Sequence, residues 1–350
     1  MKLRTWVSMT AVYLSVTLTI TVQTSAKITT FNVKGAGTGV GQGTIAIGIN
    51  VRGSIVGFYI DSIGVDHGYL RAPNGTITTF DPKGSAGTTA YGLNKEGAIT
   101  GYYIDSSGMA HGYLRAPNGT ITTFDPKGSA GTLAANINDS GVIAGYYFDS
   151  SGMAHGFLRA SNGAFTTFDP KGSTDTLPAY FSGLNSFGKV TGSYIDSRGV
   201  AHGFLRLSKR TITPFDPKGS TGTFGSSIND FCAITGSFID SSIVYHGFLR
   251  TRDGTITTFD VKGAGTGVGQ GTEPESVSNA GAIAGNYTDS RGVNHGFVRA
   301  ANGNITPFNV KGAGTGSRQG TVPKSVNNAG AIAGDYIDGS GVYHGFLRSQ

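Results

Sequence analysis

Short runs of apolar residues, separated every few positions by turn residues, dominate the chain from residue 27 onward. In the first complete unit this pattern predicts four β-strands and no helix. The strands are expected at Thr44–Asn50, Ser54–Ile60, Val65–Arg71 and Thr76–Pro82. An Asn-Gly pair at residues 74–75 lies between the last two strands and is a strong signal for a tight hairpin. The pattern therefore predicts an all-β fold built from antiparallel hairpins.

The second and fourth strands of the unit indicate how the strands are ordered in a sheet. The second, Ser54–Ile60, is apolar at almost every position, which is typical of a strand buried on both faces. Proline ends the fourth strand in several units and lies inside it at Pro214 and Pro307. Since proline lacks the N–H that a central strand donates, we expect the fourth strand at an outer edge.

One unit recurs along the whole chain, and its histidines mark it. A turn asparagine, or Ser278 in one unit, lies 17 residues before each of them, and a phenylalanine lies 13 residues after the first six. All length variation falls between that phenylalanine and the next turn residue, so this segment is expected to be a surface loop. The string His-Gly-Tyr/Phe-Leu/Val-Arg begins at His67, His111, His155, His202, His246, His295 and His344.

The two ends of the chain carry complementary parts of the unit. The C-terminal unit supplies three strands and stops, whereas the N-terminal segment Lys27–Val33 is a fourth strand alone. We therefore predict one domain, residues 27–350, folded as a seven-bladed β-propeller of four-stranded blades. Its last blade would join residues 320–350 to residues 27–33. An open solenoid is disfavoured because it would not need complementary ends.

Composition and charge narrow the class of protein. Only 14% of residues are charged while 38% are hydrophobic, which argues against disorder. The net charge of +6 is spread along the chain and forms no basic stripe, so we expect no nucleic-acid partner. Residues 1–26 indicate a signal peptide, with Lys2 and Arg4 before an apolar run; an uncleaved membrane anchor is the alternative. After cleavage we expect a secreted or periplasmic monomer with no membrane contact, and Cys232 alone can form no intramolecular disulfide.

The units resemble the extracellular repeats of the HAF family, which occur in exported bacterial proteins. The matching text is Ile137–Gly145 followed by His155–Leu158, and the resemblance extends over residues 27–350. The chain departs from the family's name-giving triplet because Gly follows every His. The resemblance implies export and a repeated fold, and it implies no particular chemistry.

Three residue types recur once per unit and are the first candidates for binding. The seven histidines could hold a metal, but one per blade spreads them around a ring, so we expect a structural role and no metal site. An aspartate begins the turn after each second strand, at Asp61, Asp105, Asp149, Asp196, Asp240, Asp289 and Asp338. A single carboxylate per turn is weak support for calcium, so we expect turn capping and no cofactor, with calcium binding by the turns as the alternative.

Lysines also recur, each just after a fourth strand. On one face of a propeller they could meet the turn aspartates and attract an anionic polymer. As solvated ion pairs they would contribute only about 0–1 kcal/mol each. These candidate ligand-binding residues are Lys34, Lys83, Lys127, Lys171, Lys218, Lys262 and Lys311.

A single active site has to break the repetition, and the largest departures fall in the first strand of each unit, which should line the central channel. Glu273 and Glu275 are two of only three glutamates, and with Lys324 and Tyr91 they are candidates for acid–base catalysis. The alternative is a solvated channel mouth with a local ion pair. The equivalent channel positions are Ile47, Tyr91, Ala135, Ser182, Ser226, Glu275 and Lys324.

These observations favour a secreted, non-catalytic binding module over an enzyme. Near-identical loops would bind a polysaccharide or an extracellular protein at several equivalent places. One alternative is a lyase or glycoside hydrolase with its site at the channel mouth, and another is a structural component of the cell envelope. No nucleophile elbow, phosphate-binding loop or dinucleotide fingerprint occurs in a convincing context.

Overall fold

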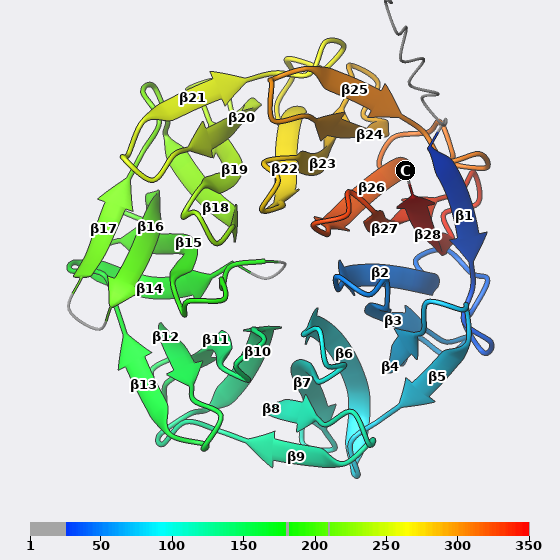
Figure 1. Ribbon diagram of the computed structural model, residues 1–350, viewed down its shortest axis with the longest axis vertical. Helices are drawn as coiled ribbons and strands as arrows, with labels where there is room; N and C mark the ends of the chain where they lie inside the picture. The colour runs from blue at the N-terminus through cyan, green and yellow to red at the C-terminus, as the bar shows by residue number, and fades with distance from the viewer. Residues whose placement is uncertain (1–25, 180–181, 209–210, 350) are drawn as a thin grey trace, which may run out of the picture.

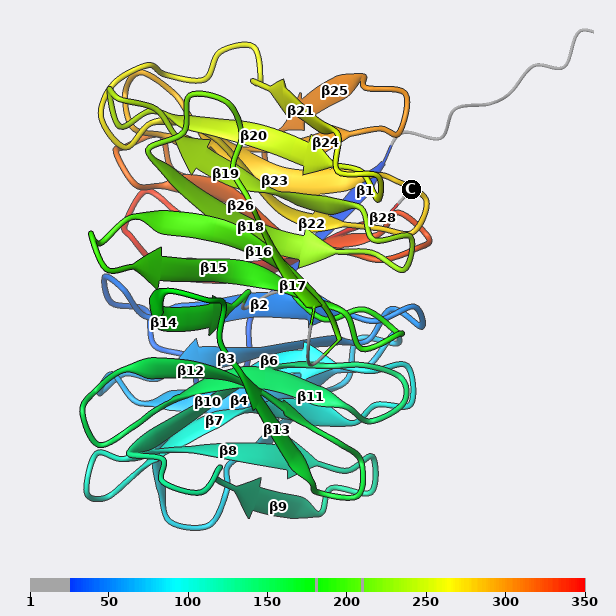
Figure 2. The same cartoon turned by 90° about the vertical axis from the view of Figure 1, so that its left-hand side faces the viewer.

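The computed structural model describes residues 26–179, 182–208 and 211–349, and within these ranges it contains β-strands, turns and loops but no helix. Figure 1 shows the strands arranged as a ring of small sheets around a central axis. Figure 2, turned by 90°, shows neighbouring sheets packed face to face around that ring. The predicted signal peptide falls almost entirely on residues 1–25, which lie outside the described ranges, and it stays a prediction. Among the described residues there is no helix of the length and apolar character that a membrane crossing needs.

Each sheet is a four-stranded antiparallel meander, and we call it a unit. Along the chain, three units are β2–β5 (Gly43–Ile49, Ile55–Ile60, Asp66–Arg71, Ile77–Phe80), β6–β9 (Ser85–Leu93, Ile99–Asp105, Ala110–Arg115, Ile121–Phe124) and β10–β13 (Gly131–Ile137, Ile143–Phe148, Ala154–Arg159, Phe165–Phe168). They are followed by β14–β17 (Ser173–Pro178, Val190–Asp196, Ala201–Ser208, Thr211–Phe215) and β18–β21 (Gly222–Ile228, Ile234–Ile239, Tyr245–Arg250, Ile256–Phe259). The chain ends with β22–β25 (Gly271–Val277, Ile283–Thr288, Asn294–Arg299, Ile305–Phe308) and with β26–β28 (Gly320–Val326, Ile332–Ile337, Tyr343–Ser349), which β1 (Lys27–Phe31) completes.

The order of strands within each unit is the predicted one. The first strand lies next to the axis and the fourth forms the rim (Figure 1). Pro214 in β17 and Pro307 in β25 therefore sit in edge strands, where a missing N–H leaves no central hydrogen bond unmade. The strand ends differ from the predicted ones by one or two residues; Pro82, for example, follows β5 instead of ending it.

The ring closes by the predicted pairing of its two ends. β1 runs antiparallel to β28, with Lys27 opposite Ser349 and Phe31 opposite Gly345. In Figure 1 the blue β1 covers the outer edge of the red β28. Residues more than 300 positions apart thus share one sheet, and β28 has no open edge on that side.

Aromatic rings and arginines join each unit to the next. Phe80 at the rim of one unit lies edge-on to Tyr113 of the next, with 6.1 Å between ring centroids. The guanidinium of Arg115 lies over the same Phe80 ring at 4.9 Å, a cation–π distance. Gly68, which follows His67, leaves room for that ring, because a Cβ there would lie 2.8 Å from Phe80. The same contacts recur around the ring, which explains the fixed spacing of His, Gly, Arg and Phe in the sequence.

A chain of asparagine amides links the turns between the first and second strands. The Asn50 side chain accepts N–H bonds from Arg52 and Ser54 within its own turn, and its Nδ2 donates to the carbonyl of Asn94 in the next unit at 3.0 Å. Asn327 donates in the same way to Asn50, at 2.9 Å, so the chain of bonds crosses the closure. Ser278 is the exception: it accepts the bond from Asn229 but has no amide with which to donate onward.

Completing this series of asparagine hydrogen bonds at Ser278 should stabilise the protein. Ser278→Asn is expected to raise the free energy of unfolding by about 1 kcal/mol, because its amide can donate to the buried turn of Asn327. Urea denaturation of both proteins measures the difference. The reverse change, Asn327→Ser, is the matched control and should cost about 1–2 kcal/mol. No gain in Ser278→Asn would mean that the amide bonds do not act as a connected set.

Candidate functional site

Each repeated histidine is held between two acidic or amide side chains of its own unit. In the first unit, Nδ1 of His67 lies 2.9 Å from Asp81 Oδ2, and Nε2 lies 3.4 Å from Asp61 Oδ2. Tyr59 stacks on the imidazole with 4.9 Å between the rings. Burial by itself would lower the pKa of His67, but its hydrogen bonds and proximity to Asp81 and Asp61 outweigh it, so the pKa is raised. These contacts join the third strand to the residue after the fourth strand and to the turn after the second strand, so the imidazole has a structural role.

The aspartates of the same turns are also occupied. Asp61 Oδ1 accepts the backbone N–H groups of Ile63 and Val65, both at 2.9 Å. These bonds, with that of His67, hold the pKa of Asp61 below its usual value. In the described part of the chain, no group of three or more His, Cys, Asp or Glu side chains is arranged to hold a metal ion.

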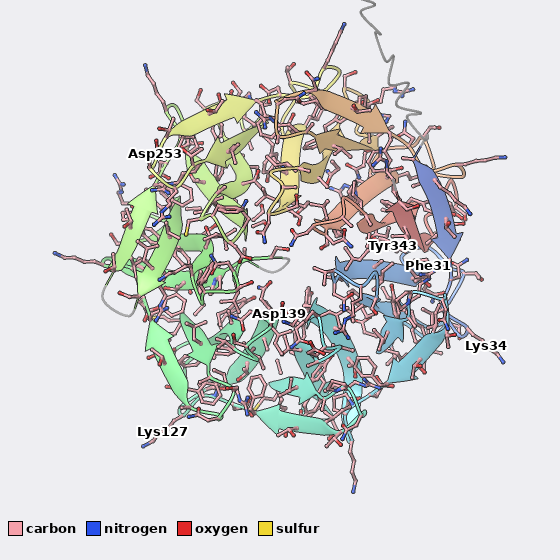
Figure 3. All side chains as sticks on the ribbon, viewed as in Figure 1. Phe31, Lys34, Lys127, Asp139, Asp253 and Tyr343 are labelled. Atoms are coloured by element: carbon pink, nitrogen blue, oxygen red, sulfur yellow. The ribbon has the colours of Figure 1, made fainter. Side chains whose placement is uncertain are left out.

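The repeated lysines do not meet the turn aspartates. No ion pair joins any of the seven lysines to an aspartate in the residues that the structure describes. Lys34 and Lys127 point outward from the rim in Figure 3. The pairing that the sequence suggested on one face is therefore not found among the described residues, and the two lysines labelled in Figure 3 follow rim strands and extend away from the ring.

The predicted channel residues occupy a special place in the innermost strands. In β2, β6, β10, β18, β22 and β26 the register shifts at one residue, a β-bulge, which re-aims a side chain. The bulged residues are Ile47, Tyr91, Ala135, Ser226, Glu275 and Lys324. Ser182 differs: it follows β14 and forms an isolated bridge with Ser227. The bulge requires a glycine on the second strand; at Gly57, for example, a Cβ would overlap the carbonyl oxygen of Ile45.

A cavity of about 270 Å³ lies where the last and first units of the ring meet. The first unit contributes aliphatic and aromatic side chains, the second a tyrosine, and the last a lysine, an aspartate and a tyrosine. The lining residues are Ile45, Ile47, Phe58, Tyr91, Lys324, Asp335 and Tyr343. Tyr91 also stacks on Tyr102, with 5.9 Å between their rings.

Asp335 is the most unusual group in this cavity. The residue is only 3% exposed, and its Oδ1 has no hydrogen-bond partner. Burial raises the pKa of Asp335 to about 6; the positive charge of Lys324 opposes the rise and the negative charge of Glu275 adds to it. Burial, together with Asp335, also raises the pKa of Tyr343.

Glu273 and Glu275 lie beside the cavity and do not line it. Burial and the neighbouring Glu275 raise the pKa of Glu273 to about 7, against the charge of Lys324 and a hydrogen bond with Asn286. Burial raises the pKa of Glu275 as well, and Lys324 opposes it. Lys324 is thus the cation shared by three carboxyl groups, Glu273, Glu275 and Asp335. The predicted cluster of Glu273, Glu275 and Lys324 is close enough to interact, and Tyr91 joins it through the cavity.

A second cavity, of about 210 Å³, lies among the turns at one end of the channel. Its polar side chains are largely used between units. Asp230, for example, accepts the backbone N–H of Ser186 at 2.9 Å and the side-chain amide of Asn279 at 2.7 Å. Asp139, beside the axis in Figure 3, accepts the N–H of Lys95 in the same way. We therefore take the cavity around Asp335 as the candidate site.

Solved structures identify the fold that carries this site. A streptogramin B lyase is 13% identical, with a TM-score of 0.54 over 93% of this chain and 98% of that one. The β-propeller domain of the trilobed protease from Pyrococcus furiosus is 8% identical, with a TM-score of 0.59 over 87% and 96%. The fold is a β-propeller. A lectin from Burkholderia pseudomallei is 12% identical, with a TM-score of 0.52 over 93% of this chain and 99% of that one. No protein-family pattern and no curated protein matches the sequence.

Sequence reasoning missed four lining residues of the propeller's candidate site, Ile45, Phe58, Asp335 and Tyr343, of which the last two carry polar groups. Asp335 had a detectable signal, since it is the only charged residue at its place in the second strand of a blade. The equivalent residues elsewhere are Phe58, Tyr102, Tyr146, Ser193, Ser237 and Asn286. Tyr343 had none, because Tyr245 occupies the same place in another blade and does not line this cavity.

Proposed function

We propose that this β-propeller is a non-catalytic binding module for a carbohydrate, and that the ligand lies in the channel cavity instead of on the repeated loops. The cavity around Asp335 carries the proposal. It combines aromatic surface from Phe58, Tyr91 and Tyr343 with a buried carboxylate, and sugars are recognised by such a mixture of apolar faces and a few placed polar groups. Its volume, about 270 Å³, is near the lower end for small-molecule sites and suits one or two sugar units.

Two further observations support a channel site. The polar atoms of the repeated histidines and aspartates already form hydrogen bonds within each blade, so they leave few free donors or acceptors for a ligand. One of the propellers of similar fold is a lectin. The signal-peptide pattern of residues 1–26 and the resemblance to exported repeats lead us to propose an extracellular or periplasmic polysaccharide as the ligand.

Binding of glycans by the chain from residue 27 onward tests this function. An array of polysaccharides and oligosaccharides, with calcium and with a chelator, should give a ligand that binds once per chain and independently of calcium. Tyr343→Ala should weaken that binding at least about tenfold, whereas Tyr245→Ala, the same change in another blade, should not. Several equal sites per chain, or binding unchanged in Tyr343→Ala, would favour the loops over the channel.

An enzyme of the lyase or glycoside hydrolase class is the second candidate, and the carboxyl groups beside Lys324 favour it. A glutamate with a pKa of about 7 next to a second carboxylate is a pairing that acid–base catalysis uses. If the protein degrades a bound glycan, Glu275→Gln is expected to abolish turnover while the protein stays folded. Turnover that is unchanged in Glu275→Gln would exclude this candidate. If neither binding nor turnover is found, a structural role in the cell envelope is the remaining candidate function.

A further inference from the structure

We propose that the ligand of the channel cavity carries a primary ammonium group, as in a polymer of glucosamine, and that this group binds the unpaired oxygen of Asp335. The inference rests on the proposed carbohydrate-binding function and names the chemical class of sugar.

The surroundings of Asp335 leave its Oδ1 without a donor. On β27 it lies opposite Val322 of β26 and Gly345 of β28, and neither has a side chain that can donate a hydrogen bond. Across the cavity, the first blade presents Ile45 and Phe58, which are apolar. A buried carboxylate oxygen without a partner costs free energy. A hydrogen bond from a ligand to this oxygen therefore contributes more to the binding free energy than the same bond at an exposed site.

The charges around the cavity favour a cationic donor over a neutral one. Within the described residues, Lys324 is the one cation found to act on Glu273, Glu275 and Asp335, so a single positive charge faces three carboxyl groups. An ammonium group would supply the missing charge and form a charge-assisted hydrogen bond to Oδ1. The rings of Phe58, Tyr91 and Tyr343 can hold the sugar face or the cation itself. An acidic sugar would meet repulsion in the same place.

Binding of a cation should also release protons. The titratable groups that face Asp335 are Lys324 on β26, Glu275 on β22, Tyr343 on β28 and Tyr69 on β4. The pKa of Asp335 is about 6 in the free protein, and a bound ammonium lowers it because it favours the ionised form. Near pH 6, therefore, binding should release a fraction of a proton, which calorimetry in buffers of different ionisation enthalpy detects.

Two oligosaccharides of equal length, a glucosamine tetramer and an N-acetylglucosamine tetramer, are the probes. At pH 6 the amine of the first is protonated, and we expect it to bind at least about tenfold more tightly than the second. Asp335→Asn should remove this difference. The variant should fold, because Asn286 occupies the equivalent place in the neighbouring blade. Asp335→Ser is a second variant, since Ser193 occupies the equivalent place in another blade.

The matched control is Asp253→Asn. It removes the same charge from a rim turn far from the channel (Figure 3), and other blades carry asparagine there, as at Asn74. It should leave the binding of both tetramers unchanged. Tighter binding of the acetylated tetramer, or a glucosamine preference that survives in Asp335→Asn and Asp335→Ser, would overturn the inference and leave the carbohydrate function standing. If no glycan binds at all, both are overturned.

Discussion

A chain that begins at residue 34 is expected to lose at least about 4 kcal/mol of stability, or not to fold, whereas one that begins at residue 27 should fold normally. The difference between them is β1 with its two following residues. Without β1, the backbone of β28 has an unpaired outer edge. The last and first blades then keep only their remaining contacts, such as the pairing of Gly43 with Tyr343. Phe31 is lost with it, so Tyr69 loses an edge-on ring at 6.2 Å and Arg71 a cation–π contact at 4.9 Å.

Urea denaturation and gel filtration of the two chains measure this effect. Adding a peptide of residues 27–33 to the shorter chain should restore part of the stability, because the peptide can pair with β28 in the register of β1. Phe31→Ala in the longer chain separates the ring contacts from the backbone pairing and should cost less than the deletion. Equal urea midpoints for the two chains would show that the ring is stable without its closing strand.

Lys324→Met is expected to lower the free energy of unfolding by about 2–4 kcal/mol at pH 8 and by far less at pH 5. At pH 8 the variant leaves Glu273, Glu275 and Asp335 without their shared cation; Asp335 is buried, and the two glutamates are partly buried. Removal of one partner from a buried charge cluster is costly because the remaining charges are neither solvated nor paired.

The pH dependence of stability follows from the direction in which the pKa values of the buried carboxyl groups are shifted. In the native protein the pKa values of Asp335 and Glu273 are raised, to about 6 and about 7, above those of the unfolded chain, near 4. The native state therefore binds more protons than the unfolded state between about pH 4 and pH 7, and stability falls as the pH rises through that window. At pH 5 both groups are mostly protonated in the native protein, so the cation matters little there.

A surface lysine supplies the control for Lys324→Met. Lys95 lies 3.9 Å from Asp139, and its side chain is 47% exposed. Lys95→Met should change stability by less than about 0.5 kcal/mol at either pH, because exposed ion pairs contribute little. Denaturation curves at pH 5 and pH 8 make the comparison. A loss in Lys324→Met that is equal at both pH values would point to packing by the lysine stem and away from its charge.

Much of the fold follows from local features of the sequence. The Asn-Gly pair at residues 74–75 fixes a hairpin, Pro307 places its strand at the rim, and the lone strand Lys27–Phe31 matches the strand that the C-terminal unit lacks. Each depends on backbone chemistry within one unit, and the unit is repeated, so every repetition tests the same prediction again. For that reason strand order and closure were predictable, with strand ends correct to within one or two residues.

The candidate site depends on tertiary structure. Ile45, Tyr91 and Asp335 are distant in sequence, and only closure of the ring brings their blades to one cavity. The repeat alignment named the channel positions, but the β-bulge found at six of them could not be recognised from the residue types there. The position of the lysines along the chain was known from the sequence, but only the folded structure shows the direction of side chains such as Lys34 and Lys127. Residue types and turns are local and can be identified in the sequence, whereas burial, charge pairing and an unmatched carboxylate arise only when distant blades pack together.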